Sequence, residues 1–248
     1  MGDFSQAFED RLQEIEAYLD LLKSLERQVQ SGTPRIGEGE QGVTITVQQQ
    51  RILYSSVYLQ LYNLVESTIT RCTDAICAAV VDTWKPCDLS AEMRREWVRF
   101  IARTHTELNY ENRLHFALEL CDYLLQVLPV STFKIEKGGG GNWDDESIER
   151  ISSRLGLSLR ISPSVYQGIK RPFRDEKGPL AYIRALRNDL GHGSLSFAES
   201  SEGVTVRDLR DLTDRTVLYL REVVTCFQLS IDNHEFLLPE RRPNRVSL

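Results

Sequence analysis

The sequence predicts an all-α protein, and two observations support this prediction. Apolar residues recur at steps of three and four over long stretches of the 248 residues, which is the period of one face of a helix. The chain shows no internal repeat and no alternation of strand and helix patterns, so a layered sheet architecture is not expected. We therefore expect a bundle of helices around one large core.

The long segments define the expected organisation. Residues 1–32 predict an amphipathic helix packed on the bundle. Residues 33–46 are rich in glycine and charge and predict a loop or a short hairpin. The segment 47–83 is apolar around much of its circumference, as is typical of a central helix. We interpret residues 47–236 as the main helical domain and residues 237–248 as a flexible tail.

Capping residues and apolar spacing locate the remaining helices. They are expected over residues 90–103, 110–128, 144–155, 162–168, 178–190 and 205–236. Thr205 and Asp208 resemble a capping box at the start of the last helix. Gly191 is the expected left-handed end of the helix over 178–190. In the helix over 110–128, the expected apolar side consists of Leu114, Phe116, Ala117, Leu120, Cys121, Leu124 and Leu125.

Composition limits the classes of function. Hydrophobic residues make up 41% of the chain and charged residues 27%, which is ordinary for a soluble globular protein. With 30 Lys and Arg against 36 Asp and Glu, the net charge is −6, so general affinity for nucleic acid is not expected. Contact with RNA would need a local basic patch. Neither a run of about 18 apolar residues nor a secretory signal is present, so we expect no membrane partner and a cytoplasmic location.

The cysteines do not predict a metal site. Their number is five, and neither a CxxC nor an HExxH spacing occurs. We therefore expect the cysteines to be small core residues of a reduced compartment, and we expect neither a metal nor a cofactor.

One stretch carries residues suited to phosphodiester chemistry. Arg187 and His192 are separated by four residues, with glycines on both sides of the histidine. Arginine is permanently charged and offers a planar fork to a phosphate. Histidine titrates near pH ~6.5 and can move a proton at neutral pH. On an unbroken helix the two residues would lie about 140° apart, so we expect the helix to end at Gly191 and let the imidazole turn toward the guanidinium.

The charge around this pair favours RNA. Between residues 170 and 192, six Lys and Arg oppose three Asp and Glu, a net charge of +3 within a chain of −6. We expect the RNA-binding residues to be Lys170, Arg171, Arg174 and Arg184. Two other interpretations stay open. His192 can simply stabilise the negative end of the helix dipole, and Arg187 can be a surface ion-pair partner.

The segment 186–193, Leu-Arg-Asn-Asp-Leu-Gly-His-Gly, resembles the signature of HEPN-domain ribonucleases, in which four to six residues separate Arg from His and a polar residue follows the Arg. It is closest to a bacterial branch of stand-alone HEPN nucleases found beside restriction and phage-defence genes. The stretch 61–69 is similar to the same branch. The resemblance covers roughly residues 1–236.

The resemblance implies a HEPN-like bundle with long antiparallel helices, and a homodimer whose Arg and His pairs meet in one composite cleft. It also implies cleavage without metal, with His192 as general acid and base, Arg187 as phosphate binder and Asn188 as an orienting residue. Asn63, Glu66 and Asp189 are possible supporting residues. For Asn63 and Glu66 the alternative is that they are buried polar groups satisfied within the bundle.

The predicted function is therefore a metal-independent endoribonuclease that cleaves RNA through attack of the 2′-hydroxyl, and acts as a toxin or an anti-phage defence effector. Its expected partners are RNA, such as a tRNA loop or another single-stranded loop, a second copy, and an antitoxin or defence-system protein. DNA lacks the 2′-hydroxyl and should not be cleaved. The alternatives are a HEPN module that binds RNA or protein without cleavage, and a regulatory helical subunit.

Overall fold

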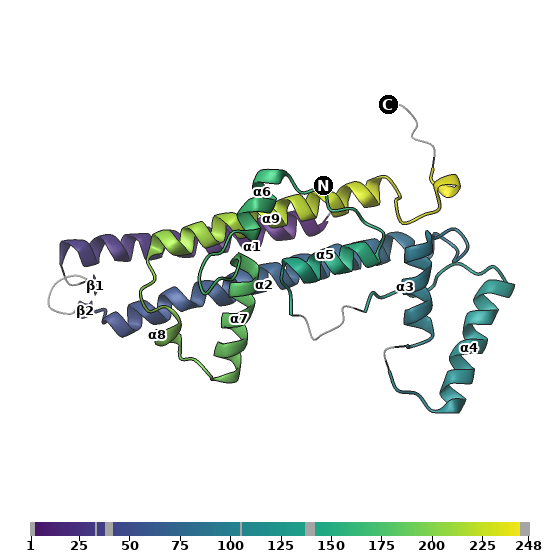
Figure 1. The fold of residues 1–248 in the computed structure, drawn as a ribbon, viewed down its shortest axis with the longest axis horizontal. Coiled ribbons are helices and arrows are strands. Elements are labelled where there is room, and N and C mark those ends of the chain that lie inside the picture. The colour runs from purple at the N-terminus through teal and green to yellow at the C-terminus, as the bar shows by residue number, and fades with distance from the viewer. Residues whose placement is uncertain (1–2, 33, 38–41, 105, 137–141, 244–248) are drawn as a thin grey trace.

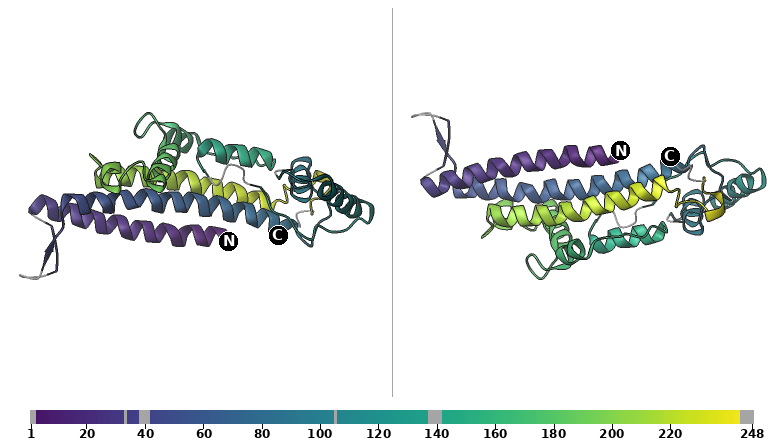
Figure 2. Two further views of the ribbon diagram at one scale, coloured as in Figure 1. Left: turned by 90° about the horizontal axis from the view of Figure 1, so that it is seen from below. Right: turned by 90° about the horizontal axis from the view of Figure 1, so that it is seen from above.

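Three long helices, α1 (Asp3–Ser31), α2 (Val47–Val80) and α9 (Val206–Asp232), lie side by side and form the body of the molecule (Figure 1). The computed structural model describes residues 3–32, 34–37, 42–104, 106–136 and 142–243. α1 packs along both α2 and α9, and α2 packs along α9. α1 runs opposite to the other two, whereas α2 and α9 run in the same direction (Figure 2). The all-α prediction is confirmed.

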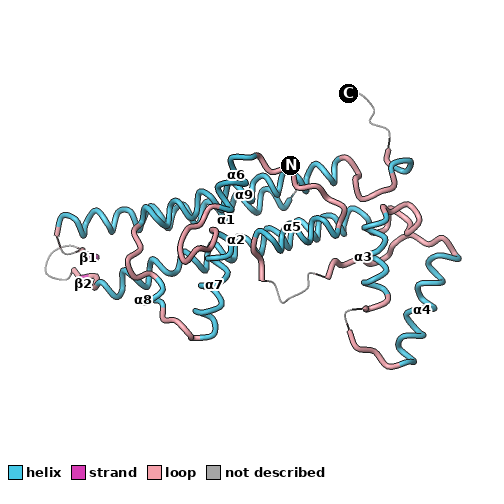
Figure 3. The backbone as a smooth tube through the Cα atoms, viewed as in Figure 1, coloured by secondary structure: helices cyan, strands magenta, loops and turns pink. Residues whose placement is uncertain are grey.

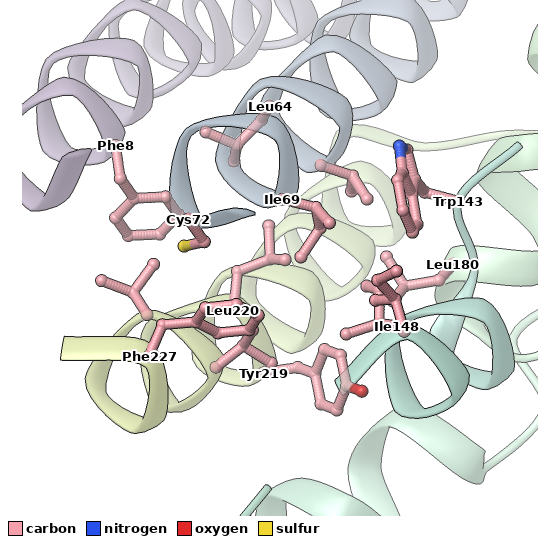
Figure 4. Packing of buried hydrophobic residues seen from close by; sticks show 14 of the residues in the cluster. Phe8, Leu64, Ile69, Cys72, Trp143, Ile148, Leu180, Tyr219, Leu220 and Phe227 are labelled. Carbon is pink, nitrogen blue, oxygen red and sulfur yellow. The ribbon is translucent and has the colours of Figure 1, made fainter. Parts of the chain in front are cut away.

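The core lies between these helices. Leu64 and Cys72 of α2, Phe8 of α1, and Leu220 and Phe227 of α9 are buried against one another (Figure 4). Burial of side chains of this size stabilises the fold by about 1.5–3 kcal/mol each. The apolar face of α1 is therefore part of the same core as α2 and α9. It covers apolar side chains of both helices that would otherwise contact water.

Capping residues start the long helices where the sequence predicted them. Thr205 accepts a hydrogen bond from the Asp208 backbone, and the Asp208 carboxylate accepts one from the Thr205 backbone, which confirms the capping box of α9. Thr46 and Gln49 form the same arrangement at α2. The short strands β1 (Arg35–Ile36) and β2 (Val43–Thr44) pair antiparallel between α1 and α2, so the segment forms a hairpin.

A second group of shorter helices covers one side of the bundle (Figure 3). The group consists of α5 (Asp145–Arg154), α6 (Pro163–Lys170), α7 (Pro179–His192) and α8 (Phe197–Ser200). α7 contacts α2 and α9, and its C-terminal end projects away from the long helices (Figure 1). The projecting end of α7 is the part of the fold that presents the Arg187 and His192 region to solvent.

At the far end of the bundle lie α3 (Ala91–Ile101), α4 (Tyr110–Leu125) and a short 3-10 helix, η3 (Pro239–Arg241). α4 packs on α3. None of the side chains of α4, all of them described, is buried. Leu120 and Tyr123 are partly buried and pack against the edge of the core, whereas Leu114, Leu124 and Leu125 are exposed, because α3 lies between α4 and the three long helices.

Other details differ from the expectations. Cys87 and Cys121 are exposed, so among the five cysteines only Cys72, Cys77 and Cys226 are core residues. Leu237, placed in the tail by sequence, is fully buried and pairs its backbone with Leu89. The tail therefore begins later, because the chain returns to α3 after α9 ends. Parts of the predicted loop (residues 33 and 38–41), the first two residues and the end of the tail (residues 244–248) lie outside the described residues.

No described helix combines the length and the apolar character that crossing a bilayer requires.

Candidate functional site

Aromatic and aliphatic contacts hold α7 on the bundle. Tyr182 meets Tyr58 of α2 edge to face, with ring centroids 5.8 Å apart. Ile183 and Leu186 are buried on the same side of the helix. These positions recur at steps of one, three and four and leave the rest of the α7 surface free for polar side chains. The orientation of α7 is therefore set by its apolar side, and that side places Arg187 toward α2.

The helix does not end at Gly191. α7 continues through His192, and Gly193 is its left-handed cap, with φ +71°. The Ser194 amide donates a hydrogen bond to the Asp189 carbonyl at 2.9 Å and closes the helix end. The expected break is therefore wrong: of the two glycines beside His192, the second provides the positive φ. As a result, Arg187 and His192 lie on one unbroken helix, about 140° apart around its axis.

The Arg187 guanidinium is positioned by two neighbours. It lies over the ring of Tyr62 on α2, with 4.7 Å between the guanidinium carbon and the ring centroid. Its Nη1 donates to the Asn188 side-chain oxygen at 3.0 Å. Both contacts restrict the guanidinium, and Arg187 and Asn188 remain partly exposed. A partly exposed arginine whose guanidinium plane is held in place is suited to binding a phosphate.

His192 and Asp189 lie on the exposed part of the same helix. Within the part of the chain that the structure describes, the His192 imidazole has no hydrogen-bond or ion-pair partner. The structure thus does not bring the imidazole and the guanidinium of one chain together. It places one against α2 and leaves the other at the projecting end of α7.

The two candidate residues from the stretch 61–69, Asn63 and Glu66, differ in burial. Glu66 is partly buried and close enough to Tyr62 to affect it electrostatically. Asn63 is exposed, so the alternative that Asn63 is a buried polar group is wrong. Burial raises the pKa of Tyr62, Glu66 raises it further, and Arg187 and a backbone hydrogen bond from Trp143 oppose them. The phenol of Tyr62 therefore stays protonated and neutral beneath the guanidinium.

The four cations expected to bind RNA are engaged with the chain's own acceptors. Lys170 contacts Asp145 at 2.7 Å and Glu149 at 3.2 Å. Arg184 pairs with Asp144, the capping residue of α5. The ion pairs of the other two cations are longer, although Arg174 also has a close backbone acceptor. Arg174 donates to the Gly203 carbonyl at 2.6 Å and lies 3.9 Å from Asp208, and Arg171 lies 3.9 Å from Asp211 with 68% of its side chain exposed. Arg171 is therefore the most accessible of the four.

Sequence reasoning missed Tyr62 as part of this site. Tyr62 is buried and occurs in an apolar central helix, where an aromatic residue is most simply read as core. One signal in the sequence could have indicated that Tyr62 belongs to the site. The candidate residue Glu66 follows it by four residues, so the two side chains share one face of the helix. The contact with Arg187 depends on how α7 docks on α2, which local sequence does not specify.

The described residues thus form an all-α bundle that carries Arg187, Asn188 and His192 on one short projecting helix. The family model HEPN_MAE_28990-like HEPN matches residues 3–236 of this chain. The chain therefore belongs to this HEPN family. The match begins at Asp3, the first residue of α1, and therefore includes α1. Comparison with curated proteins and with solved structures gave no match.

Proposed function

We propose that this protein is an endoribonuclease of the HEPN type that cleaves RNA without a metal ion. The proposal rests on the arrangement of two residues on α7 in a chain of the HEPN family. Tyr62 and Asn188 position the Arg187 guanidinium, and His192 is exposed at the end of the helix. The guanidinium binds a phosphate, and the imidazole exchanges a proton with solvent or substrate.

The active site is formed by two subunits. Because α7 is unbroken, the imidazole and the guanidinium of one chain point about 140° apart around the helix axis. A second copy, related by a two-fold axis near the projecting end of α7, supplies His192 to the phosphate held by Arg187 of the first copy. Each subunit contributes a different half of the chemistry.

The reaction is an internal transfer. The ribose 2′-hydroxyl attacks the adjacent phosphorus, a bond from its oxygen to phosphorus forms, and the bond from phosphorus to the 5′-oxygen breaks. His192 accepts the proton of the 2′-hydroxyl and delivers a proton to the leaving 5′-oxygen, so that the proton lost by one oxygen is gained by the other. Arg187 stabilises the negative charge that develops on the phosphoryl oxygens, and Asn188 keeps the guanidinium in its plane. The products are a 2′,3′-cyclic phosphate and a 5′-hydroxyl.

The substrate is RNA with an exposed single-stranded segment, such as a tRNA loop. Three of the four basic residues near α7 make close contacts with the chain's own acidic groups and carbonyls, so the surface attracts bulk nucleic acid weakly. Arg171 supplements the site as a phosphate contact. In the cell we propose a role as a toxin or anti-phage defence effector that an antitoxin or trigger controls.

Incubation of the pure protein with RNA in excess chelator tests the proposal. We expect cleavage of single-stranded RNA that ends in a 2′,3′-cyclic phosphate, and no cleavage of DNA of the same sequence, because DNA lacks the attacking hydroxyl. The products are identified by mass spectrometry and by resistance of the 3′ end to ligation. Cleavage that requires added magnesium, or that leaves a 5′-phosphate, contradicts the proposal.

The internal ion pairs favour a second candidate, a HEPN module that binds a protein partner or RNA without cleavage. Lys170, Arg174 and Arg184 already have acidic or carbonyl partners in the chain. On this alternative, replacement of His192 changes affinity for the partner and leaves RNA intact in every preparation.

Tyr62 is expected to be a positioning residue for Arg187. Replacement Tyr62→Leu removes the ring beneath the guanidinium and is expected to lower kcat/KM for RNA about tenfold, since a cation over an aromatic ring is worth roughly 0.5–2 kcal/mol. Tyr62→Phe keeps the ring and is the matched control, with activity within about twofold of wild type. Because Tyr62 is buried, circular dichroism verifies that both variants fold. Equal activity of the Leu and Phe variants would exclude this role.

A further inference from the structure

Arg184 lies one turn before Arg187 on α7, on the same side of the helix. Residues three apart on a helix are separated by about 60° around its axis and by about 4.5 Å along it, so their side chains are neighbours. Arg187 reaches toward Tyr62 of α2, and Arg184 reaches toward the start of α5, which lies beside α7 (Figure 1). α7 therefore presents two guanidinium groups on one face.

The two residues that precede α5 connect both arginines to one buried phenol. The Trp143 backbone amide donates a hydrogen bond to the phenol of Tyr62. The next residue, Asp144, accepts a hydrogen bond from Nη1 of Arg184. Burial raises the pKa of Tyr62, whereas the guanidinium groups of Arg187 and Arg184 both lower it. Both guanidinium groups therefore lie close to the same phenol.

Asp144 holds the Arg184 side chain in place, as Asn188 does for Arg187. One carboxylate oxygen of Asp144 accepts a hydrogen bond from the Ser147 backbone at 2.8 Å and caps α5. The other oxygen accepts from Arg184. Only 8% of the Asp144 side chain is exposed. Because the carboxylate is buried and fixed by the α5 cap, it also restricts the guanidinium that it binds.

Most of the Arg184 guanidinium is still free to bind a ligand. Arginine has five N–H donors, and within the described part of the chain Asp144 accepts one of those of Arg184. The Arg184 side chain is 36% exposed. Lys170 differs because it contacts two carboxylates, and Arg174 differs because it donates to two carbonyls. An anion can therefore bind Arg184 without displacing Asp144.

We propose that Arg184 binds the phosphate next to the one held by Arg187, so that the site binds two successive phosphates of an RNA strand. The inference rests on the proposed function, in which Arg187 binds the phosphate that is cleaved. A planar guanidinium that is held in place suits a phosphate. Two of them on one helix face suit the regular spacing of charge along a strand. A substrate with a single phosphate therefore lacks one contact.

DNA strands that contain a single ribose test this contact. The ribose fixes the linkage that is cleaved, and in two further strands the phosphate before or after that linkage is replaced by an uncharged methylphosphonate. We expect one of these replacements to lower kcat/KM of the wild-type protein about tenfold, the scale of one hydrogen bond to a charged group. In Arg184→Gln the same replacement is expected to change kcat/KM by less than about twofold, because the two changes remove the same contact. A merely structural role of Arg184 would lower kcat/KM equally for all strands.

Arg154→Gln is the matched control. Arg154 ends α5 and pairs with the buried Glu96, as Arg184 pairs with the buried Asp144, so its loss imposes a similar cost on stability. We expect Arg154→Gln to retain the wild-type response to the methylphosphonate. The variant Arg184→Gln/Asp144→Asn leaves no buried carboxylate without its arginine at this position, and asparagine still caps α5. It is expected to lose the response and replaces the single variant if that variant does not fold.

The response to the methylphosphonate decides the outcome. Wild-type protein that is indifferent to both replacements overturns the proposal, as does an Arg184→Gln variant that responds like wild type or an Arg154→Gln variant that loses the response. Strands with deoxyribose throughout give the same comparison as an affinity, measured by fluorescence anisotropy without cleavage. A loss of about tenfold in affinity that depends on Arg184, in protein that cleaves no RNA, contradicts the proposed catalysis and supports the two-phosphate contact.

Discussion

Replacement His192→Ala is expected to lower the rate of RNA cleavage by about 10²–10⁴-fold, the usual contribution of a general acid or base. The imidazole is exposed and the described structure gives it no hydrogen-bond partner, so its removal leaves the fold intact. The rate is measured under single-turnover conditions, with the thermal unfolding midpoint as the check on folding. The control is Ser194→Ala, which changes an exposed side chain of the same turn and is expected to retain full activity.

Mixing of variants shows whether the site spans two subunits. Arg187→Ala and His192→Ala are each inactive, but a mixed dimer combines the intact arginine of one with the intact histidine of the other. After unfolding and refolding together, activity is expected to return to up to about one quarter of wild type, because half of the randomly formed dimers are mixed and each has one intact pair. No recovery would mean that each chain acts with its own pair. Unchanged cleavage by His192→Ala alone would remove His192 from the chemistry.

Replacement Trp97→Ala is expected to lower the free energy of unfolding by about 3–5 kcal/mol, the range for truncation of a buried tryptophan. Trp97 is fully buried on α3 and packs edge to face on Tyr123 of α4. Its loss leaves a large cavity where α3 and α4 meet and weakens the packing of α4 on α3. Unfolding in guanidinium chloride, followed by circular dichroism, measures the change.

The control for Trp97 is Trp97→Phe, which is expected to cost much less than the alanine variant. The indole Nε1 is buried without a hydrogen-bond partner among the described residues, so phenylalanine removes an unsatisfied donor. Removal of this donor stabilises the variant by about 1–3 kcal/mol. It therefore offsets part of the free-energy cost of the small cavity that phenylalanine leaves. A loss below about 1 kcal/mol for Trp97→Ala would show that this junction relaxes around the gap.

Local sequence was a good guide to the helices and a poor guide to where the exposed helix faces point. The capping residues Thr205 and Asp208 predicted the start of α9 correctly, because a capping box involves four adjacent residues. The apolar side of α4 was equally clear, but periodicity reports that a face is apolar and not what covers it. The tertiary structure decided that Leu120 packs at the edge of the core while Leu114, Leu124 and Leu125 are exposed, because α3 lies between α4 and the bundle.

The end of α7 shows a second limit. Gly191 and Gly193 both suit a left-handed cap by composition, and the chain uses Gly193. The choice depends on where the chain must turn toward α8, a property of the packed structure. It changes the site, because two more helical residues carry His192 away from Arg187 and make a second subunit necessary to the proposed reaction.

The sequence by itself determined the helical class and the family, and it indicated Arg187 and His192 as the candidate pair, because periodicity, caps and a short motif are local properties of the chain. The tertiary structure alone decided that Tyr62 lies under Arg187, that the nearby cations have acceptors of their own, and that much of the apolar face of α4 is exposed. These depend on contacts between residues far apart in the chain, where burial and distance act only after the helices have docked.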